Sequence, residues 1–149
     1  MKAKLSWIKD MKFECENHGL ITSIDSSKEH GGHESAPTPK ELILNAMMGC
    51  TGMDVVSILQ KMRQEIADFK MEIEVEKTIE HPVHFKTAKL VYLLNGPIDP
   101  EKAIKAVDSS LTKYCGVNYM ISKTCQIRFD IILNGSSIKQ GPVQFIEPK

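Results

Sequence analysis

The sequence predicts an α+β fold, in which alternating strands accompany one long helix and one shorter helix. Apolar and polar residues alternate near both ends of the chain and again in its middle, which is typical of strands with one solvated face. Between these segments, residues 38–66 carry apolar side chains every three to four positions and predict a helix roughly 40 Å long. We therefore expect strands, a long helix, a hairpin, a second helix and a final strand.

The N-terminal part of the chain predicts short strands and a loop. Residues 2–16 predict one or two strands because apolar and charged side chains alternate there. A turn at residues 17–19 precedes a short apolar segment, residues 20–24, that predicts another strand. Residues 26–37 are rich in Ser, Gly, His and Pro and predict a loop.

The long helix has a clear start signal. Thr38 fits the N-cap, Pro39 the first helical position and Glu41 the third, which together form a capping box. Its expected buried stripe is Leu42, Ala46, Gly49, Met53, Val56, Leu59 and Arg63. Because apolar residues also fill the other faces, we expect this helix to be central rather than peripheral.

The second half of the chain predicts a hairpin, a helix and a strand. Residues 71–76 alternate strictly, and together with residues 85–94 they predict a hairpin with one wet face. Asp99 and Pro100 predict the start of a second helix, which ends near residue 115. The expected buried stripe of this helix is Ile104, Val107, Leu111 and Tyr114. A short helical turn at 117–121 and a strand at 125–131 follow, and the tail from Ser136 predicts irregular or weakly extended structure.

Composition limits the classes of function. A length of 149 residues suits a single domain, residues 1–149. The 19 basic and 19 acidic residues cancel, and only Arg63 and Arg128 are arginines, which argues against a nucleic-acid partner. The sequence predicts no signal peptide and no membrane span, since no stretch approaches the ~18 apolar residues that a span needs. We expect a soluble, cytoplasmic protein without a membrane partner.

The four cysteines are the candidate reactive groups. In the cytoplasm, their spacing without a C-x-x-C motif does not predict a permanent disulfide framework, so structural thiols or redox chemistry remain. Cys15 and Cys125 lie on the apolar faces of predicted alternating strands, and we expect both in the core. Cys50 lies between Gly49 and Gly52 in the long helix, where each Gly costs about 1 kcal/mol relative to Ala. Something must therefore approach this segment closely, either another backbone or a substrate.

Two cysteine motifs point to a known family. The run from Pro39 to Thr51, PKELILNAMMGCT, resembles the first cysteine motif of the OsmC/Ohr family, and residues 114–117, YCGV, resemble its second. The order of the elements agrees over nearly the whole chain. The resemblance implies an OsmC-like fold, with antiparallel sheets wrapped around a long central helix, in an intertwined homodimer with two active sites at the subunit interface.

The same resemblance implies a thiol-dependent peroxidase that reduces organic hydroperoxides in oxidative-stress defence. Cys50 would be the peroxidatic thiol, oxidised to a sulfenic acid, and Cys115 the resolving thiol that closes a disulfide. A dithiol would reopen the disulfide, and in the best-known branch this is a lipoylated protein or a small-molecule dithiol. No cofactor is expected.

Two positions depart from the peroxidase branch, which has a glutamate ten residues before the first cysteine and an arginine near the N-terminus. Lys40 occupies the glutamate position, and no arginine precedes Arg63. Glu41, nine residues before Cys50, is our candidate for the missing carboxylate. The offset of one residue from the family's position turns its side chain by about 100° around the helix. The candidates for a cation that stabilises the Cys50 thiolate in place of the arginine are a lysine of the partner's N-terminal strands (Lys4, Lys9 or Lys12), Lys40, or a side chain from elsewhere in the dimer.

The residues after Cys50 also differ from the main peroxidases. Asp54 shares a helix face with Cys50, and an ionised carboxylate there would oppose formation of a thiolate. The pattern CTGMDVV resembles the less characterised YhfA-like branch of the family, for which no substrate is implied.

A second interpretation is a non-catalytic OsmC-like dimer that senses oxidants or binds a small apolar ligand. An unpaired cysteine in a helix is most often a small buried apolar residue, and the glycines beside it could simply admit a neighbouring helix. The missing arginine favours this interpretation, whereas the two cysteines favour the enzyme. The histidine pairs His30/His33 and His81/His84 do not predict a metal site, because no second pair accompanies either.

Overall fold

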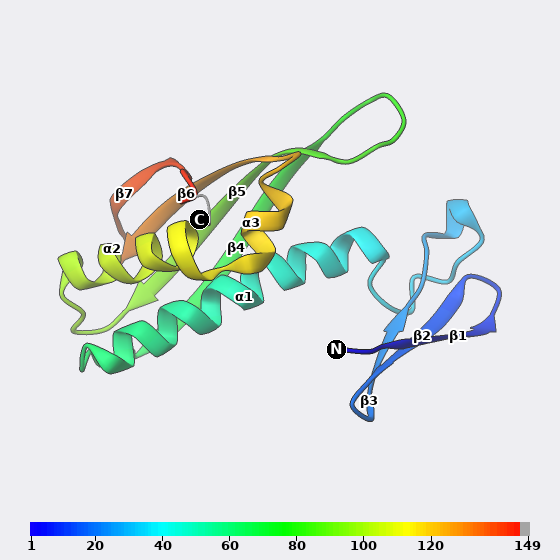
Figure 1. The fold of residues 1–149 in the computed structure, drawn as a ribbon, viewed down its shortest axis with the longest axis horizontal. Helices are drawn as coiled ribbons and strands as arrows, with labels where there is room; N and C mark the ends of the chain where they lie inside the picture. The colour runs from blue at the N-terminus through cyan, green and yellow to red at the C-terminus, as the bar shows by residue number, and fades with distance from the viewer. Residues whose placement is uncertain (147–149) are drawn as a thin grey trace. The chain divides into compact units, whose positions relative to one another are not determined.

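The computed structural model describes residues 1–146 and confirms the α+β fold. The chain divides into two compact units, Met1–Asn45 and Ala46–Lys149. The first contains a three-stranded sheet, and the second a four-stranded sheet with helices (Figure 1). The boundary falls within the long helix.

The first unit is an antiparallel meander of β1 (Lys4–Lys9), β2 (Lys12–Asn17) and β3 (Leu20–Ile24). The predicted turn between β2 and β3 is confirmed: His18 and Gly19 have φ of 54° and 80°, as a two-residue turn of a twisted hairpin requires. Large apolar side chains of this sheet are exposed, namely Leu5, Trp7, Ile8, Leu20 and Ile21. Cys15 is only half-buried, contrary to expectation, because its cross-strand neighbours Leu5 and Thr22 are themselves exposed.

Asp25 organises the loop between β3 and the long helix, which contains the 3₁₀ turn η1 (Lys28–His30). Its carboxylate is buried and accepts hydrogen bonds from Ser35 N at 3.0 Å, Ser35 Oγ at 2.8 Å, Ser26 N at 2.8 Å and His33 N at 3.2 Å. These hydrogen bonds, those from Ser35 first, hold the pKa of the Asp25 carboxyl well below its usual range. The sequence predicted the loop but not the aspartate that shapes it.

The helix α1 (Pro39–Lys61) begins as predicted and ends earlier than predicted. Thr38 N donates to the Glu41 carboxylate at 2.7 Å, and Glu41 N donates to Thr38 Oγ1 at 3.4 Å, which confirms the capping box. The predicted end near residue 66 is wrong. Arg63 adopts φ of 56°, and the hydrogen bonds Arg63 N to Gln60 O and Gln64 N to Leu59 O, both 2.9 Å, form a Schellman motif that stops the helix.

The buried face of α1 also differs from the prediction. The fully buried residues are Met47, Thr51, Val55 and Leu59, each four positions after the last. Of the predicted stripe only Leu59 belongs to this set, and Met53 is 72% exposed. Apolar residues surround the helix, so a spacing of three to four fits more than one stripe, and periodicity cannot choose between them. By length and composition alone α1 could also cross a membrane, with a mean hydropathy of 1.6 over an 18-residue window.

The second unit is built on a four-stranded sheet in the order β4-β5-β6-β7. The strands β4 (Asp68–Lys77) and β5 (Phe85–Asn95) form the predicted antiparallel hairpin. The strand β6 (Gln126–Leu133) runs parallel to β5, so the chain crosses over through helices between them. The tail, predicted as irregular or weakly extended, is a strand β7 (Ser136–Pro142) paired with β6, with a register shift between Ile131 and Ile132. Alternate side chains of β5 and β6 form the buried face, and Cys125 just before β6 is buried, as predicted.

The crossover positions one of the two motif cysteines. The helix α2 (Pro100–Ser109) starts with the predicted cap, in which Lys102 N donates to Asp99 Oδ1 at 3.0 Å. A π-helical turn, η2 (Ser110–Tyr114), follows, closed by Cys115 N donating to Ser110 O, and then α3 (Gly116–Ile121). A π turn holds one more residue than an α turn, so the residues that follow it lie on different faces of the helix from those that an α-helical period predicts. Tyr114, predicted as buried, is therefore 55% exposed, whereas Cys115 is 2% exposed.

Substitution of Asp25 tests its role in the loop. We expect Asp25→Asn to speed tryptic cleavage after Lys28, because one amide oxygen cannot accept all the hydrogen bonds that the carboxylate accepts. Glu29→Gln, an exposed change in the same loop, is the control and should leave cleavage unchanged. Since folding lowers the pKa of Asp25, its contribution to stability is present above 3.8 and is lost as the pH falls below that value. The difference in free energy of unfolding between wild type and Asp25→Asn should therefore shrink in acid.

Candidate active site

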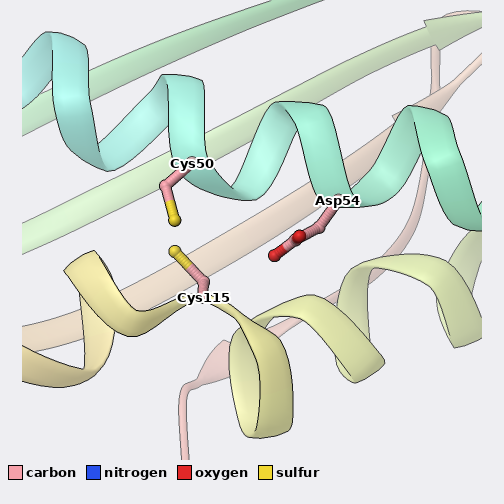
Figure 2. Close-up of side chains that lie close together, drawn as sticks. All are labelled: Cys50, Asp54 and Cys115. Carbon is pink, nitrogen blue, oxygen red and sulfur yellow. The ribbon is translucent and has the colours of Figure 1, made fainter.

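Three side chains that could carry chemistry converge between α1 and the crossover. Cys50 and Asp54 lie one turn apart on α1, and Cys115 lies between η2 and α3. Their sulfur and oxygen donor atoms all lie within 4.8 Å of one another. Figure 2 shows the two thiols directed toward each other, with the carboxylate beside them. The two cysteines singled out in the sequence, 65 residues apart, thus meet in space.

Burial distinguishes the two thiols. Cys50 is half-buried, whereas Cys115 is 2% exposed. Loss of contact with water raises the pKa of the Cys115 thiol to about 12, against the opposing effect of hydrogen bonds from Asn118. Both cysteines are free. Cys50 is therefore the more accessible thiol, and Cys115 is a neutral thiol at physiological pH.

Asn118 fixes the position of Cys115. Its side chain is completely buried, and Nδ2 donates to Cys115 Sγ at 3.1 Å and to Met47 O at 3.2 Å. The amide therefore ties α3 to α1 at the level of the two thiols. Its Oδ1 has no hydrogen-bond partner within residues 1–146. Asn118 was not predicted from the sequence, where its only signal is its place three residues after Cys115.

A chain of buried hydroxyl groups leads to Asp54. Tyr92 OH and Thr51 Oγ1 are 2.8 Å apart, Thr51 Oγ1 and Ser110 Oγ are 2.8 Å apart, and Ser110 Oγ donates to Asp54 Oδ2 at 2.9 Å. Burial raises the pKa of Tyr92, so its hydroxyl stays protonated. Thr51, Tyr92 and Ser110 were also missed, since three separate elements contribute them and no local pattern marks them.

Comparisons with known proteins identify the family. Residues 32–130 match the model of the family described as OsmC-like protein, a span that includes both cysteine motifs. The chain belongs to the OsmC family. Protein YhfA of Escherichia coli (strain K12) is 34% identical over 131 residues, which are 85% of this chain and 93% of that protein. The resemblance to the OsmC/Ohr family and to its YhfA-like branch is confirmed.

Solved structures share the fold. An OsmC-like protein from Mycoplasma pneumoniae has a TM-score of 0.77 at 10% identity, over 89% of this chain and 95% of that one. An organic hydroperoxide resistance protein OsmC from Legionella pneumophila has a TM-score of 0.66 at 18% identity, over 87% and 94% of the two chains. At these identities the likeness concerns the fold alone, and it confirms the expected OsmC-like α+β fold. The expectation of antiparallel sheets is wrong for the second sheet, because the helical crossover brings β6 parallel to β5.

Glu41, the third residue predicted for the OsmC site, has a structural role. It lies in the first turn of α1, where its carboxylate accepts the Thr38 N–H of the capping box. The lysines considered as substitutes for the family's arginine, Lys4, Lys9, Lys12 and Lys40, belong like Glu41 to the first unit. A catalytic role for any of them stays a prediction.

A second feature of α1 is an open apolar groove of about 590 Å³ on its less buried face. The groove is lined by Met48, Gly49, Gly52, Met53, Val56, Ser57, Gln60, Phe69 and Met71. A Cβ on Gly52 would lie 3.3 Å from Met71 Sδ, so this glycine admits β4, whereas a Cβ on Gly49 would meet nothing within 4 Å. Gly52 thus makes room for a strand and not for the neighbouring helix that was expected, and Gly49 borders open space.

The two thiols and Asp54 are also a set of donors that could hold a metal ion, since thiolates and a carboxylate suit zinc with a fourth ligand from solvent. It is the one such group of three in residues 1–146. The histidine pairs are not part of it: His33 Nε2 lies 3.0 Å from Asp10 Oδ2, and His84 Nδ1 lies 2.9 Å from Pro82 O.

The burial of Cys115 predicts its alkylation behaviour. Below its pKa of about 12, the thiolate fraction and hence the alkylation rate should rise about tenfold per pH unit, up to at least pH 10. The rate follows from mass spectrometry of the peptide that contains residue 115, in a Cys50→Ser variant. A plateau near pH 9 would show that Cys115 is an ordinary exposed thiol.

Proposed function

We propose that this protein is a two-cysteine peroxidase that reduces organic hydroperoxides in oxidative-stress defence. The observation that carries the proposal is the approach of the Cys50 and Cys115 sulfur atoms to within 4.8 Å. Membership of the OsmC family supports it, because structural neighbours include proteins named for organic hydroperoxide resistance. The half-buried Cys50 takes the peroxidatic role and the buried Cys115 the resolving role.

The reaction has three steps. The Cys50 thiolate attacks the terminal oxygen of the hydroperoxide, the O–O bond breaks, and the alkoxide leaves as an alcohol after taking a proton. Cys115 then attacks the Cys50 sulfur, the S–O bond breaks, and water leaves as the disulfide forms. An external dithiol, either a small molecule or a lipoylated protein, restores both thiols by exchange. The two electrons that reduce each peroxide therefore come from the dithiol.

We also propose that the protein works as a cytoplasmic homodimer in which residues 1–149 form one OsmC-like domain. The family match spans the boundary between the two units. The exposed apolar side chains of β1–β3 and the groove along α1 are the surfaces that a second copy would cover. Burial against a second copy also accounts for the apolar composition of α1 without a membrane. Four free cysteines fit a reducing compartment.

Steady-state and single-turnover kinetics test the peroxidase proposal. With a dithiol donor, we expect cumene hydroperoxide to be consumed faster than hydrogen peroxide. Cys50→Ser should reduce consumption to the free-dithiol background, because it removes the group that attacks the peroxide. In Cys115→Ser, consumption should stop after one equivalent of hydroperoxide when the donor cannot reach the sulfenic acid.

Cys15→Ser is the matched control and should keep full turnover. If wild-type turnover is no faster than that of the free dithiol, the peroxidase is ruled out. The alternative is then a non-catalytic dimer that senses oxidants or binds a small apolar ligand, which the missing family arginine and the groove along α1 favour.

The proposed catalytic role of Glu41 needs a variant that keeps the helix cap. Glu41→Gln removes the charge but preserves a capping-box acceptor. If Glu41 assists Cys50, this change should lower the rate of sulfenic acid formation while the free energy of unfolding changes by less than about 0.5 kcal/mol. An unchanged rate would restrict Glu41 to capping.

The homodimer is tested by charging the groove. Met53→Lys places an ammonium group in the apolar groove and should shift the protein from dimer to monomer in analytical ultracentrifugation. Ile79→Lys, at another exposed apolar residue, is the control. A wild-type monomer, or a dimer indifferent to Met53→Lys, would contradict the proposed interface.

A further inference from the structure

The resolving step poses a chemical problem that the proposed function does not solve. The nucleophile in disulfide formation is a thiolate, and Cys115 is a buried thiol. It must lose its proton while its sulfur attacks Cys50. Asn118 donates a hydrogen bond to this sulfur and so can stabilise negative charge, but a donor cannot remove a proton. A base close to Cys115 would therefore speed this step.

We propose that Asp54 is this base: its carboxylate takes the proton of Cys115 during disulfide formation, held in place by the hydroxyl chain of Ser110, Thr51 and Tyr92. The proposal rests on the peroxidase function and extends it. Asp54 lies one helical turn after Cys50, and its oxygen is within 4.8 Å of both sulfur atoms. Figure 2 shows it beside the space between the thiols. A single water molecule or a small side-chain rotation bridges such a distance.

The hydroxyl chain fixes the position of Asp54. A hydroxyl has one proton to give, and an ionised carboxylate only accepts. Ser110 Oγ can donate its one proton to Thr51 Oγ1 or to Asp54 Oδ2. When an ionised Asp54 accepts that proton, Thr51 can donate to Ser110 and Tyr92 to Thr51. All three hydroxyl-bearing residues are completely buried, so this chain does not depend on solvent. Ser110 engages Oδ2, and we assign Oδ1 to the proton of Cys115.

The step is balanced in atoms and electrons. The Cys115 S–H bond breaks and its proton moves to Asp54, while the Cys115 sulfur forms a bond to the Cys50 sulfur. The S–O bond of the sulfenic acid breaks, and the departing hydroxide takes up the proton from Asp54 to leave as water. Cys50 sulfur is reduced by one electron and Cys115 sulfur is oxidised by one. Asp54 ends ionised, as it began.

This role predicts opposite effects on the two chemical steps. A carboxylate beside Cys50 opposes negative charge on that thiol, so Asp54 should slow the first step and speed the second. Asp54→Asn keeps the shape of the side chain and an acceptor for Ser110. We expect it to form the sulfenic acid at least as fast as wild type, and to close the disulfide about a hundredfold more slowly, within the range of general-base catalysis.

The first experiment mixes reduced protein with one equivalent of cumene hydroperoxide. Dimedone trapping measures the sulfenic acid, and the loss of both thiols measures the disulfide, each followed by mass spectrometry. Sulfenic acid should accumulate in Asp54→Asn and not in wild type. Ser110→Ala, which frees the carboxylate, should slow closure by a smaller factor. Asp108→Asn, which alters the carboxylate that pairs with Lys139, is the control and should behave as wild type.

A second experiment separates this inference from the peroxidase function. In a Cys15→Ser, Cys125→Ala background, Cys50 is converted to its mixed disulfide with thionitrobenzoate, and attack by Cys115 releases the coloured thiolate without any peroxide. Release should be fast in wild type and about a hundredfold slower with Asp54→Asn. Equal release rates would overturn the role of Asp54, as would equal slowing of sulfenic acid formation and closure. A wild type that consumes no hydroperoxide but shows the release difference would overturn the peroxidase function alone.

Discussion

The candidate site depends on how the segment that carries Cys115 is held against α1. Two buried polar contacts join them: Asn118 donates to the Met47 carbonyl, and Ser110 bonds with Thr51. Breaking either contact would destabilise the fold, because a buried polar group without a hydrogen-bond partner has lost its contacts with water and gained none in return. The π turn between Ser110 and Cys115 sets the spacing of these contacts and turns the thiol inward. Together they bring Cys115 to Cys50.

These contacts also explain the different environments of the two thiols. The same packing that places Cys115 against α1 removes it from water and leaves it protonated, whereas Cys50 stays partly accessible. A buried thiol is protected from direct oxidation and can react through the sulfur next to it. The polar groups around the pair, namely Asn118 and the hydroxyl chain to Asp54, belong to α3, β5, η2 and α1. An OsmC protein without the family's N-terminal arginine thus still has a structured polar environment at its thiols.

Local signals predicted much of the fold, and tertiary packing decided the rest. The capping box at Thr38 and the Asp99 cap were predicted because the chemistry of a helix start lies within four residues. The end of α1 was missed because Arg63 takes the left-handed conformation that usually identifies a glycine. Tyr114 was placed on the wrong face because a π turn changes the helical period without a sequence signature.

The candidate site was predictable only in part. The resemblance identified Cys50 and Cys115, and the structure adds that they meet. Thr51, Tyr92, Ser110 and Asn118 could not be found, because each is an ordinary core position until its partner from another element is known. The expected buried stripe of α1 was wrong for a related reason. Apolar side chains lie on every side of this helix, so tertiary packing and not the sequence pattern determines which face is buried.

The most direct test of this account is a map of where oxidation by hydroperoxide leaves the four cysteines. Reduced protein is treated with one equivalent of cumene hydroperoxide, digested without reductant, and the peptides are identified by mass spectrometry. The account predicts one cross-linked peptide pair joining Cys50 to Cys115, with Cys15 and Cys125 still free. Oxidation of Cys50 to higher acids with Cys115 untouched, or a disulfide that involves Cys15 or Cys125, would contradict it.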